Sequence, residues 1–317
     1  MQSKQFTDWA VKLHTKTAQA GGAVIIDGIV ECGLAPNLRT LTEGGDGCLY
    51  HTYGSFVGGA PVLGFTTLDL KAFLDECALT GMLVDADGSH PGVVAYWQRM
   101  AHGGGRGAAS VHASTTFGDG ILVPRSIQLS HGGNARLSAE LAATSSDGST
   151  APMTYAETAS LDADTYPAVA AAWTLGKVDL NGTELAGLRS VEIQCGVTLD
   201  VEGGDGDQWP TFASIRRIQP TVTATGRHVD ITSTVTESGV YYTAEQVTVY
   251  ARKRSEGGGY VADGTAEHIK FTLGKCRVET GPIGGDPKDG QVIITPWYTA
   301  GEADVLPIAI DTAAAYA

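Results

Sequence analysis

The chain has 317 residues, of which 43% are hydrophobic and 18% are charged, so it can bury a core and is not disordered throughout. Its formal net charge of −14 argues against general binding to nucleic acid or anionic membranes, although it would permit the protein to surround DNA without gripping it. The start lacks a secretion signal, and no apolar run approaches the roughly 20 residues that span a bilayer. We expect a soluble protein made in a reducing cytoplasm.

The predicted elements begin with a helix. Leu68–Gly81 carries apolar residues at helical spacing, and Gly81 is a suitable stop. A second, weaker helix is predicted over Val93–Ala101. Alternating apolar and polar residues predict strands in RSIQLS, ARLSAELAAT, SVEIQCGVTLDVEG, PTVTATGRHVDITSTVT, EQVTVYARK, EHIKFTLGKCRVE and QVIITPWYT. Strand starts recur at a spacing that suits a sandwich or a barrel.

The chain also contains an internal repeat. EGGDGCLYHTYGSFVGGAPVL, which starts at Glu43, aligns without a gap on EGGDGDQWPTFASIRRIQPTV, which starts at Glu202, and the spacing from Glu43 to Glu202 is called the repeat offset below. The segments 93–107 and 135–153 resemble 246–261 and 290–308 at similar offsets, and Ile26-Asp27-Gly28 is matched to Leu180-Asn181-Gly182. This pattern predicts an internal duplication.

The predicted fold is therefore mainly β. It has two tandem β-sandwich or barrel domains related by duplication, each with at most a short helix. The first domain is expected to span residues 1–158 and the second 159–317, with a linker around Glu157–Asp164 that is rich in Ala, Ser and Asp.

Motifs that would indicate chemistry are missing from the sequence. There is no P-loop, no HExxH and no GxSxG, so we predict no catalytic residue, no cofactor and no metal site. The five cysteines are odd in number and lie far apart, which argues against a disulfide framework or a zinc site. The acidic, glycine-rich loops leave one question open, because Glu43 with Asp46, or Glu202 with Asp205 and Asp207, would suit a cation.

A few charged residues are instead candidates for contacts between subunits. Against a net charge of −14, the pair Arg216-Arg217 is better interpreted as a partner for acidic loops of neighbouring copies than as a nucleic-acid site. The predicted inter-subunit or inter-ring loops contain Glu43, Asp46, Glu202, Asp205, Arg216 and Arg217.

Two stretches resemble the core of phage tail tube proteins, the major tail proteins of the virion. They are WTLGKVDLNGTELAGLRSVEIQCGVTLDVEGGDGDQWPTFASIRRIQPTVTAT (173–225) and VPRSIQLSHGGNARLSAELAATSSDG (123–148). The resemblance implies a β-sandwich closed by a helix, with an extended loop for stacking. In this family some members carry two tandem domains and form trimeric, pseudo-hexameric rings, and this chain looks like that kind.

The resemblance further implies that the rings stack into a hollow tube in the virion tail, made of subunits synthesised in the host cytoplasm. DNA would pass through an acidic lumen without specific binding. The implied partners are further copies of the chain and the tail terminator, tape-measure and baseplate or initiator proteins, with no membrane involved.

Three alternatives stay open on the sequence alone. A two-domain carbohydrate-binding or adhesin module would use exposed aromatic residues and calcium loops. A jelly-roll glycoside hydrolase would need two converging carboxylates. A capsid decoration or other head protein would differ from a tube subunit in its assembly geometry.

Overall fold

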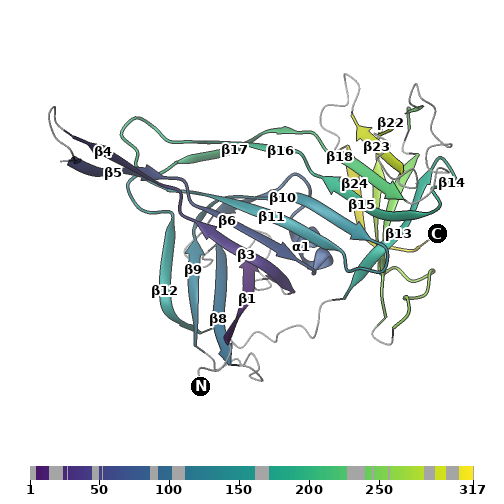
Figure 1. The fold of residues 1–317 in the computed structure, drawn as a ribbon, viewed down its shortest axis with the longest axis horizontal. Coiled ribbons are helices and arrows are strands. Elements are labelled where there is room, and N and C mark those ends of the chain that lie inside the picture. The colour runs from purple at the N-terminus through teal and green to yellow at the C-terminus, as the bar shows by residue number, and fades with distance from the viewer. Residues whose placement is uncertain are drawn as a thin grey trace.

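The fold is taken from a computed structural model. It describes residues 5–13, 24–26, 28–44, 50–51, 53–85, 92–101, 111–160, 171–226, 240–244, 246–255, 258–281, 290–297 and 307–316. These residues form 24 strands and one helix, which confirms the mainly β prediction (Figure 1). The sheets are antiparallel, and no sheet in the described part of the chain closes into a barrel, so the sandwich is the form adopted.

The first half of the chain forms a sandwich with two layers. One layer is a five-stranded sheet of order β12-β9-β8-β1-β2. Its strands are β1 (Gln5–Leu13), β2 (Val24–Ile26), β8 (Val93–Ala101), β9 (Val111–Phe117) and β12 (Met153–Ser160). The facing layer consists of β3 (Ile29–Ala35), β6 (Val62–Thr67), β7 (Met82–Asp85), β10 (Asp119–Ser130) and β11 (Arg136–Thr144).

The second half is built in the same way. Its five-stranded sheet has the order β14-β13-β20-β21-β24. These strands are β13 (Trp173–Leu180), β14 (Thr183–Glu184), β20 (Val247–Lys253), β21 (His268–Leu273) and β24 (Ile308–Ala314). The facing layer consists of β15 (Leu188–Gln194), β18 (Thr221–Gly226), β19 (Val240–Tyr242), β22 (Cys276–Thr280) and β23 (Gly290–Pro296).

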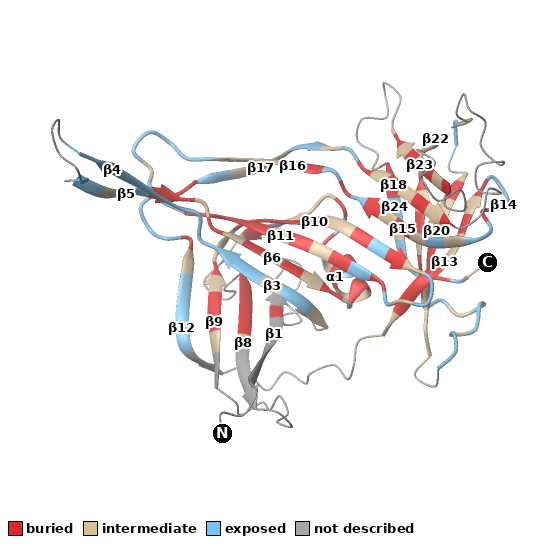
Figure 2. Ribbon diagram, viewed as in Figure 1, coloured by how far each residue is buried: buried red, intermediate tan, exposed pale blue. Residues whose placement is uncertain are grey.

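The two facing layers are one continuous sheet. Strand β10 of the first half pairs with β15 of the second half, which gives a ten-stranded sheet of order β19-β22-β23-β18-β15-β10-β11-β6-β3, with β7 alongside β10. Buried apolar residues occur along this sheet in both halves, and Figure 2 shows buried positions on its strands. Strand β11 illustrates the cause, because Leu137, Ala139 and Leu141 alternate with more exposed polar residues and face the core.

Helix α1 (Leu70–Glu76) confirms the predicted first helix, although it is shorter than the expected Leu68–Gly81. The Asp69 carboxylate caps its start by accepting a hydrogen bond from the amide of Ala72, at 3.3 Å. Its buried side chains include Phe73, whose ring meets that of Phe65 edge-on with the centroids 6.0 Å apart. The helix thus covers one end of the first core.

The prediction of a second helix over Val93–Ala101 is wrong, because these residues form β8. All nine residues pair with β1, and Val93–Trp97 also pair with β9. A continuous apolar run that is buried within a sheet has no periodicity that separates it from a buried helix. The predicted linker also needs correction, since its first residues, up to Ser160, are the end of β12; residues 161–164 lie outside the described ranges.

Strand order in the second half repeats that of the first half. In the shared sheet, β3-β6-β11-β10-β7 corresponds to β15-β18-β23-β22-β19. Irregularities of register recur as well: the pairing of β3 with β6 shifts between Ile29 and Glu31, and that of β15 with β18 shifts between Leu188 and Ser190. The two shifts are separated by the repeat offset. Duplication as the origin of this likeness stays a prediction.

One detail of the proposed repeat is wrong. Gly28 and Gly187 both have positive φ, at 63° and 76°, and both immediately precede the strand that contains the register shift. The counterpart of the segment around Gly28 is therefore the segment around Gly187, rather than Leu180-Asn181-Gly182. Asn181 and Gly182 form the tight turn between β13 and β14.

Candidate assembly interface

Two hairpins extend from the shared sheet, and they contain the sequence-predicted contact residues. The first consists of β4 (Leu38–Glu43) and β5 (Tyr53–Gly59), and the second of β16 (Val197–Glu202) and β17 (Phe212–Ile218). In Figure 1 the first hairpin projects from the body of the molecule, whereas the second runs along it. The pairing shifts between Arg39 and Thr40 in the first hairpin and, one repeat offset later, between Thr198 and Leu199 in the second.

The acidic candidates occupy matching places on different hairpins. Glu43 lies opposite Tyr53 at the end of β4, and Glu202 lies opposite Phe212 at the end of β16; both carboxylates are exposed. Asp205 is exposed in the turn that follows β16, and Asp46 lies outside the described residues. The structure therefore places Glu43 at the end of one hairpin and Glu202 with Asp205 at the end of the other.

The basic candidates Arg216 and Arg217 are exposed on β17. A nitrogen of Arg216 lies 3.7 Å from a carboxylate oxygen of Asp200 on the neighbouring strand. Such an exposed pair contributes little to stability and leaves the side chain available to another partner.

The second hairpin is bound to the first half by backbone hydrogen bonds. The carbonyl of Gly148 accepts from the amides of Gln208 and Trp209, at 2.8 and 3.0 Å. The carbonyl of Gln208 accepts from the amide of Gly59, and that of Pro210 accepts from the amide of Ser145, at 3.0 and 2.7 Å. The end of the second hairpin is thus held between the loop after β11 and the base of the first hairpin.

Trp209 is the apolar centre of this contact. Its ring centroid lies 5.3 Å from that of Phe56, and the residue is buried. A Cβ on Gly59 would lie 2.8 Å from the indole, so a side chain at that position would collide with it. Trp209 is aligned with Tyr50 in the repeat, but nothing in the sequence indicates that Trp209 is buried and Tyr50 exposed.

The loop after β11 is kept in shape by Asp147. Its carboxylate accepts hydrogen bonds from the amides of Thr150 and Ser149, at 2.7 and 2.9 Å, and from the Thr150 hydroxyl at 2.8 Å. These bonds, those from Thr150 first, hold the pKa of Asp147 well below its usual value. Because Gly148 follows directly, the same turn presents the carbonyl that the second hairpin uses.

Arg125 joins three strands beneath the second hairpin. Its guanidinium donates to both carboxylate oxygens of Glu140 on β11, at 2.5 and 3.2 Å, and to the carbonyl of Val197 on β16, at 2.6 Å. The side chain lies at the register irregularity of β10, where no partner opposes it in the pairing with β11. The sequence signals neither this irregularity nor the contact.

The junction of the two halves is a regular antiparallel pairing. Ser126–Ser130 of β10 lie opposite Ser190–Gln194 of β15, and Ile127 faces Ile193 within the core. No strand pairs with the outer edge of β3 in the described part of the chain, although β3 holds the same place in the first half as β15 in the second. Large exposed apolar residues gather on that edge and on the adjoining hairpin: Val30, Leu34, Leu38, Leu41, Tyr50, Tyr53, Phe56 and Val57.

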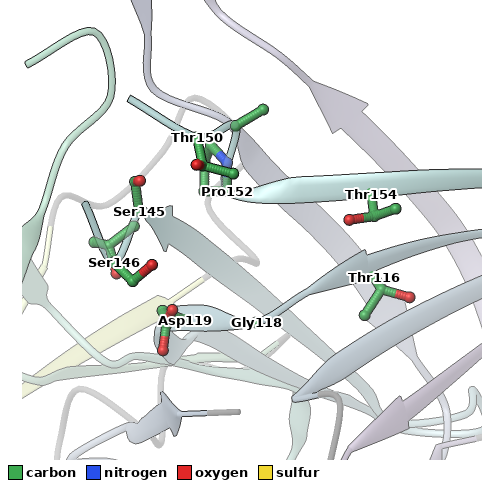
Figure 3. A pocket seen from close by; sticks show the side chains of 10 residues that line it. Thr116, Gly118, Asp119, Ser145, Ser146, Thr150, Pro152 and Thr154 are labelled. Atoms are coloured by element: carbon green, nitrogen blue, oxygen red, sulfur yellow. The ribbon is translucent and has the colours of Figure 1, made fainter. Parts of the chain in front are cut away.

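The pocket in Figure 3 offers little reactive chemistry. It has a volume of about 270 Å³ and lies between β9, β10 and the residues around Ser145–Thr154. Asp119 is the single ionisable side chain among its described lining residues, and the others supply hydroxyl groups and small surfaces. Elsewhere, burial raises the pKa of Cys195 and of Cys276 to about 12, so neither thiol is an anion near neutral pH.

No group of three or more His, Cys, Asp and Glu residues in the described ranges is arranged to hold a metal ion. At the tip of the second hairpin the Asp207 carboxylate accepts hydrogen bonds from the Gly204 amide and the Thr211 hydroxyl, at 2.5 and 3.1 Å. Among the same residues no helix is long and apolar enough to cross a membrane. Neither a protein-family model nor a curated protein matches the chain.

Proposed function

We propose that this protein is a structural subunit that assembles head to tail with further copies of itself, as the tail tube protein of a bacteriophage does. The observation that carries the proposal is the pairing of β10 with β15, which joins two sandwiches of the same strand order edge to edge in one sheet. A contact that joins like units within a chain also suits joining like units between chains. Such heterologous contacts close into rings or extend into filaments.

Three chains would supply six similar halves, so a trimeric ring would be pseudo-hexameric. Stacked rings would form a hollow tube in the virion tail, with the tail terminator, tape-measure and baseplate or initiator proteins as its further partners. The resemblance of residues 123–148 and 173–225 to tail tube proteins supports this assignment.

The open face of the shared sheet suits the lining of a DNA conduit. Its charges of the two signs nearly balance, because Glu140 pairs with Arg125 and Glu279 with Arg277, while Glu31, Glu192 and Arg136 lie on the same face. The rest of the face is largely hydroxyl and amide groups, which include Thr66, Ser126, Gln128, Ser138, Ser190, Gln194, Thr221, Thr223, Thr225 and Gln291. DNA is bound mainly by clustered Lys and Arg, so a face of this kind would let it pass. We therefore propose a polar lumen in place of the strongly acidic one that the resemblance implies.

Negative-stain electron microscopy of the purified protein at high concentration tests the proposal. We expect rings or hollow tubes whose end views have threefold or pseudo-sixfold symmetry. A small discrete oligomer that never stacks would contradict the tube and favour the carbohydrate-binding alternative. A glycan array with and without calcium would then test that alternative.

A further inference from the structure

We infer that the outer edge of β3 and the β4–β5 hairpin bind the second half of another copy, in the way that β15 and the β16–β17 hairpin bind the first half of the same chain. The inference rests on the proposed function and assigns the residues of the contact. Positions separated by the repeat offset occupy the same places in the two halves, so their surroundings can be compared directly.

The edge strands give the first comparison. Leu34 on β3 lies opposite Leu63, and Ile193 on β15 lies opposite Val222, so both point to the core side of the sheet. Ile193 is 0% exposed because β10 pairs alongside it, whereas Leu34 is 37% exposed at an edge without such a strand. A strand added to β3 would bury Leu34 as β10 buries its counterpart.

The hairpins give the second comparison. Leu38 and Val197 begin the two hairpins, and they are 56% and 6% exposed. Tyr50 and Trp209 hold the same place in the two hairpin turns, and they are 83% and 8% exposed. At both positions the side chain is apolar and buried in the second half, and apolar and exposed in the first half. The first hairpin therefore carries apolar side chains that are suited to a contact and are exposed in the single chain.

The second half of another copy is the occupant that fits, because it repeats the surface that the second hairpin already covers. Strand β17 packs against β10 and β11, whose Val123 and Ala142 are buried. In the second half, Val278 of β22 lies opposite Ile294 of β23, just as Leu122 lies opposite Leu141 in the first half. The residues that follow, Glu279 and Thr295, are therefore the counterparts of Val123 and Ala142. Glu279 and Thr295 are partly exposed in the single chain.

Each chain would then carry one donor surface, β3 with the first hairpin, and one acceptor surface, of which β22 and β23 form the part that meets the hairpin. The counterpart of Ser126–Ser130, which pair with β15, falls on residues 282–286, and these lie outside the described ranges. Such contacts are heterologous, so a symmetric two-chain complex that uses the donor surface twice does not satisfy them. The inference therefore fixes polarity as well as location.

Amide hydrogen exchange of the wild-type chain provides a test with an internal control. On assembly, the amides of Glu31–Ala35 that point away from β6 should become protected, while those of Ser190–Gln194 on β15 should be protected before and after. Assembly without new protection in β3 would overturn this inference and leave the proposed function standing. Chains that stay single at every concentration would overturn both.

Complementation tests the polarity. A donor variant, Leu34→Asp with Leu38→Asp, and an acceptor variant, Thr295→Arg, should each stay single, while their mixture forms a complex of one chain of each kind. The matched control is Tyr155→Asp, an exposed aromatic residue on β12 of the other sheet, which should assemble as the wild type does. Circular dichroism should show that all three are folded. Folded variants that assemble like the wild type, or a mixture that forms no pair, would overturn the inference.

Discussion

Trp209 is the residue that best shows how the second half holds the first. Its indole lies against Phe56 and Gly59, and its backbone amide donates to the carbonyl of Gly148, so this one residue contacts two segments of the other half. Tyr50 holds the matching position but is exposed. Substitutions at Trp209 and Tyr50 therefore compare the same position of the repeat in a buried and in an exposed environment.

We predict that Trp209→Ala lowers the free energy of unfolding by about 3 kcal/mol, because it removes a large buried side chain and leaves a cavity. Tyr50→Ala should change it by less than about 0.5 kcal/mol in the single chain. Urea unfolding at low protein concentration measures both values. Equal effects of the two substitutions would show that the indole contact does not hold the halves together.

Gly196 lies between β15 and β16 with φ of 62°, and an added Cβ would lie 1.8 Å from the carbonyl oxygen of Gln219. Gly196→Ala should therefore destabilise the protein by more than the roughly 1–2 kcal/mol that a left-handed conformation alone costs. Gly182→Ala is the control, because φ there is 80° but nothing lies within 4 Å of the added Cβ. An equal loss of stability for the two variants in thermal unfolding would show that the backbone at Gly196 does not approach Gln219 closely.

The lowered pKa of Asp147 predicts that the stability of the protein depends on pH in the acidic range. The pKa of this carboxyl is lowered in the folded chain, so its contribution to stability is complete above the unfolded value of about 3.9 and is lost as the pH falls toward the folded pKa. Asp147→Asn should be less stable than the wild type at pH 7, and the difference should shrink below about pH 4. Urea unfolding across this range measures it, and a difference that stays constant with pH would contradict the role of the carboxylate.

At the scale of elements, the sequence was informative where a pattern is local. Helix α1 was predictable from the spacing of Leu70, Phe73 and Leu74, which is helical. Strand β8 was not, because its apolar run suits a buried strand and a buried helix equally. The contact residues on the hairpins were chosen by charge, whereas the structure points to apolar residues of the same hairpins, whose covering depends on segments distant in the sequence.

Arg125 links β10, β11 and β16, so its loss tests how the second hairpin is seated. Arg125→Met should lower the free energy of unfolding by about 1–2 kcal/mol, a value reduced for screening because about a third of each partner's side chain is exposed. A double-mutant cycle with Glu140→Gln should give a favourable coupling energy between the two residues. Strict additivity would show that the ion pair contributes nothing.

At the scale of the whole molecule, the repeat allowed two similar halves to be predicted, but not the sheet that they share. The pairing of Ser126–Ser130 with Ser190–Gln194 joins segments far apart in the chain, and nothing in either segment distinguishes this neighbour from others. The same pairing makes β15 an internal strand of the shared sheet, whereas its counterpart β3 lies at the edge of that sheet. From that asymmetry follow both the proposed assembly and its head-to-tail direction.

The most direct test of this account is the mass of the wild-type protein in solution over a wide range of concentrations. The account predicts growth in whole multiples of the 32.9 kDa chain, through open intermediates, to a closed ring of three chains or to stacks of such rings. A complex that stops at two chains, or a chain that remains single at every concentration, would contradict it.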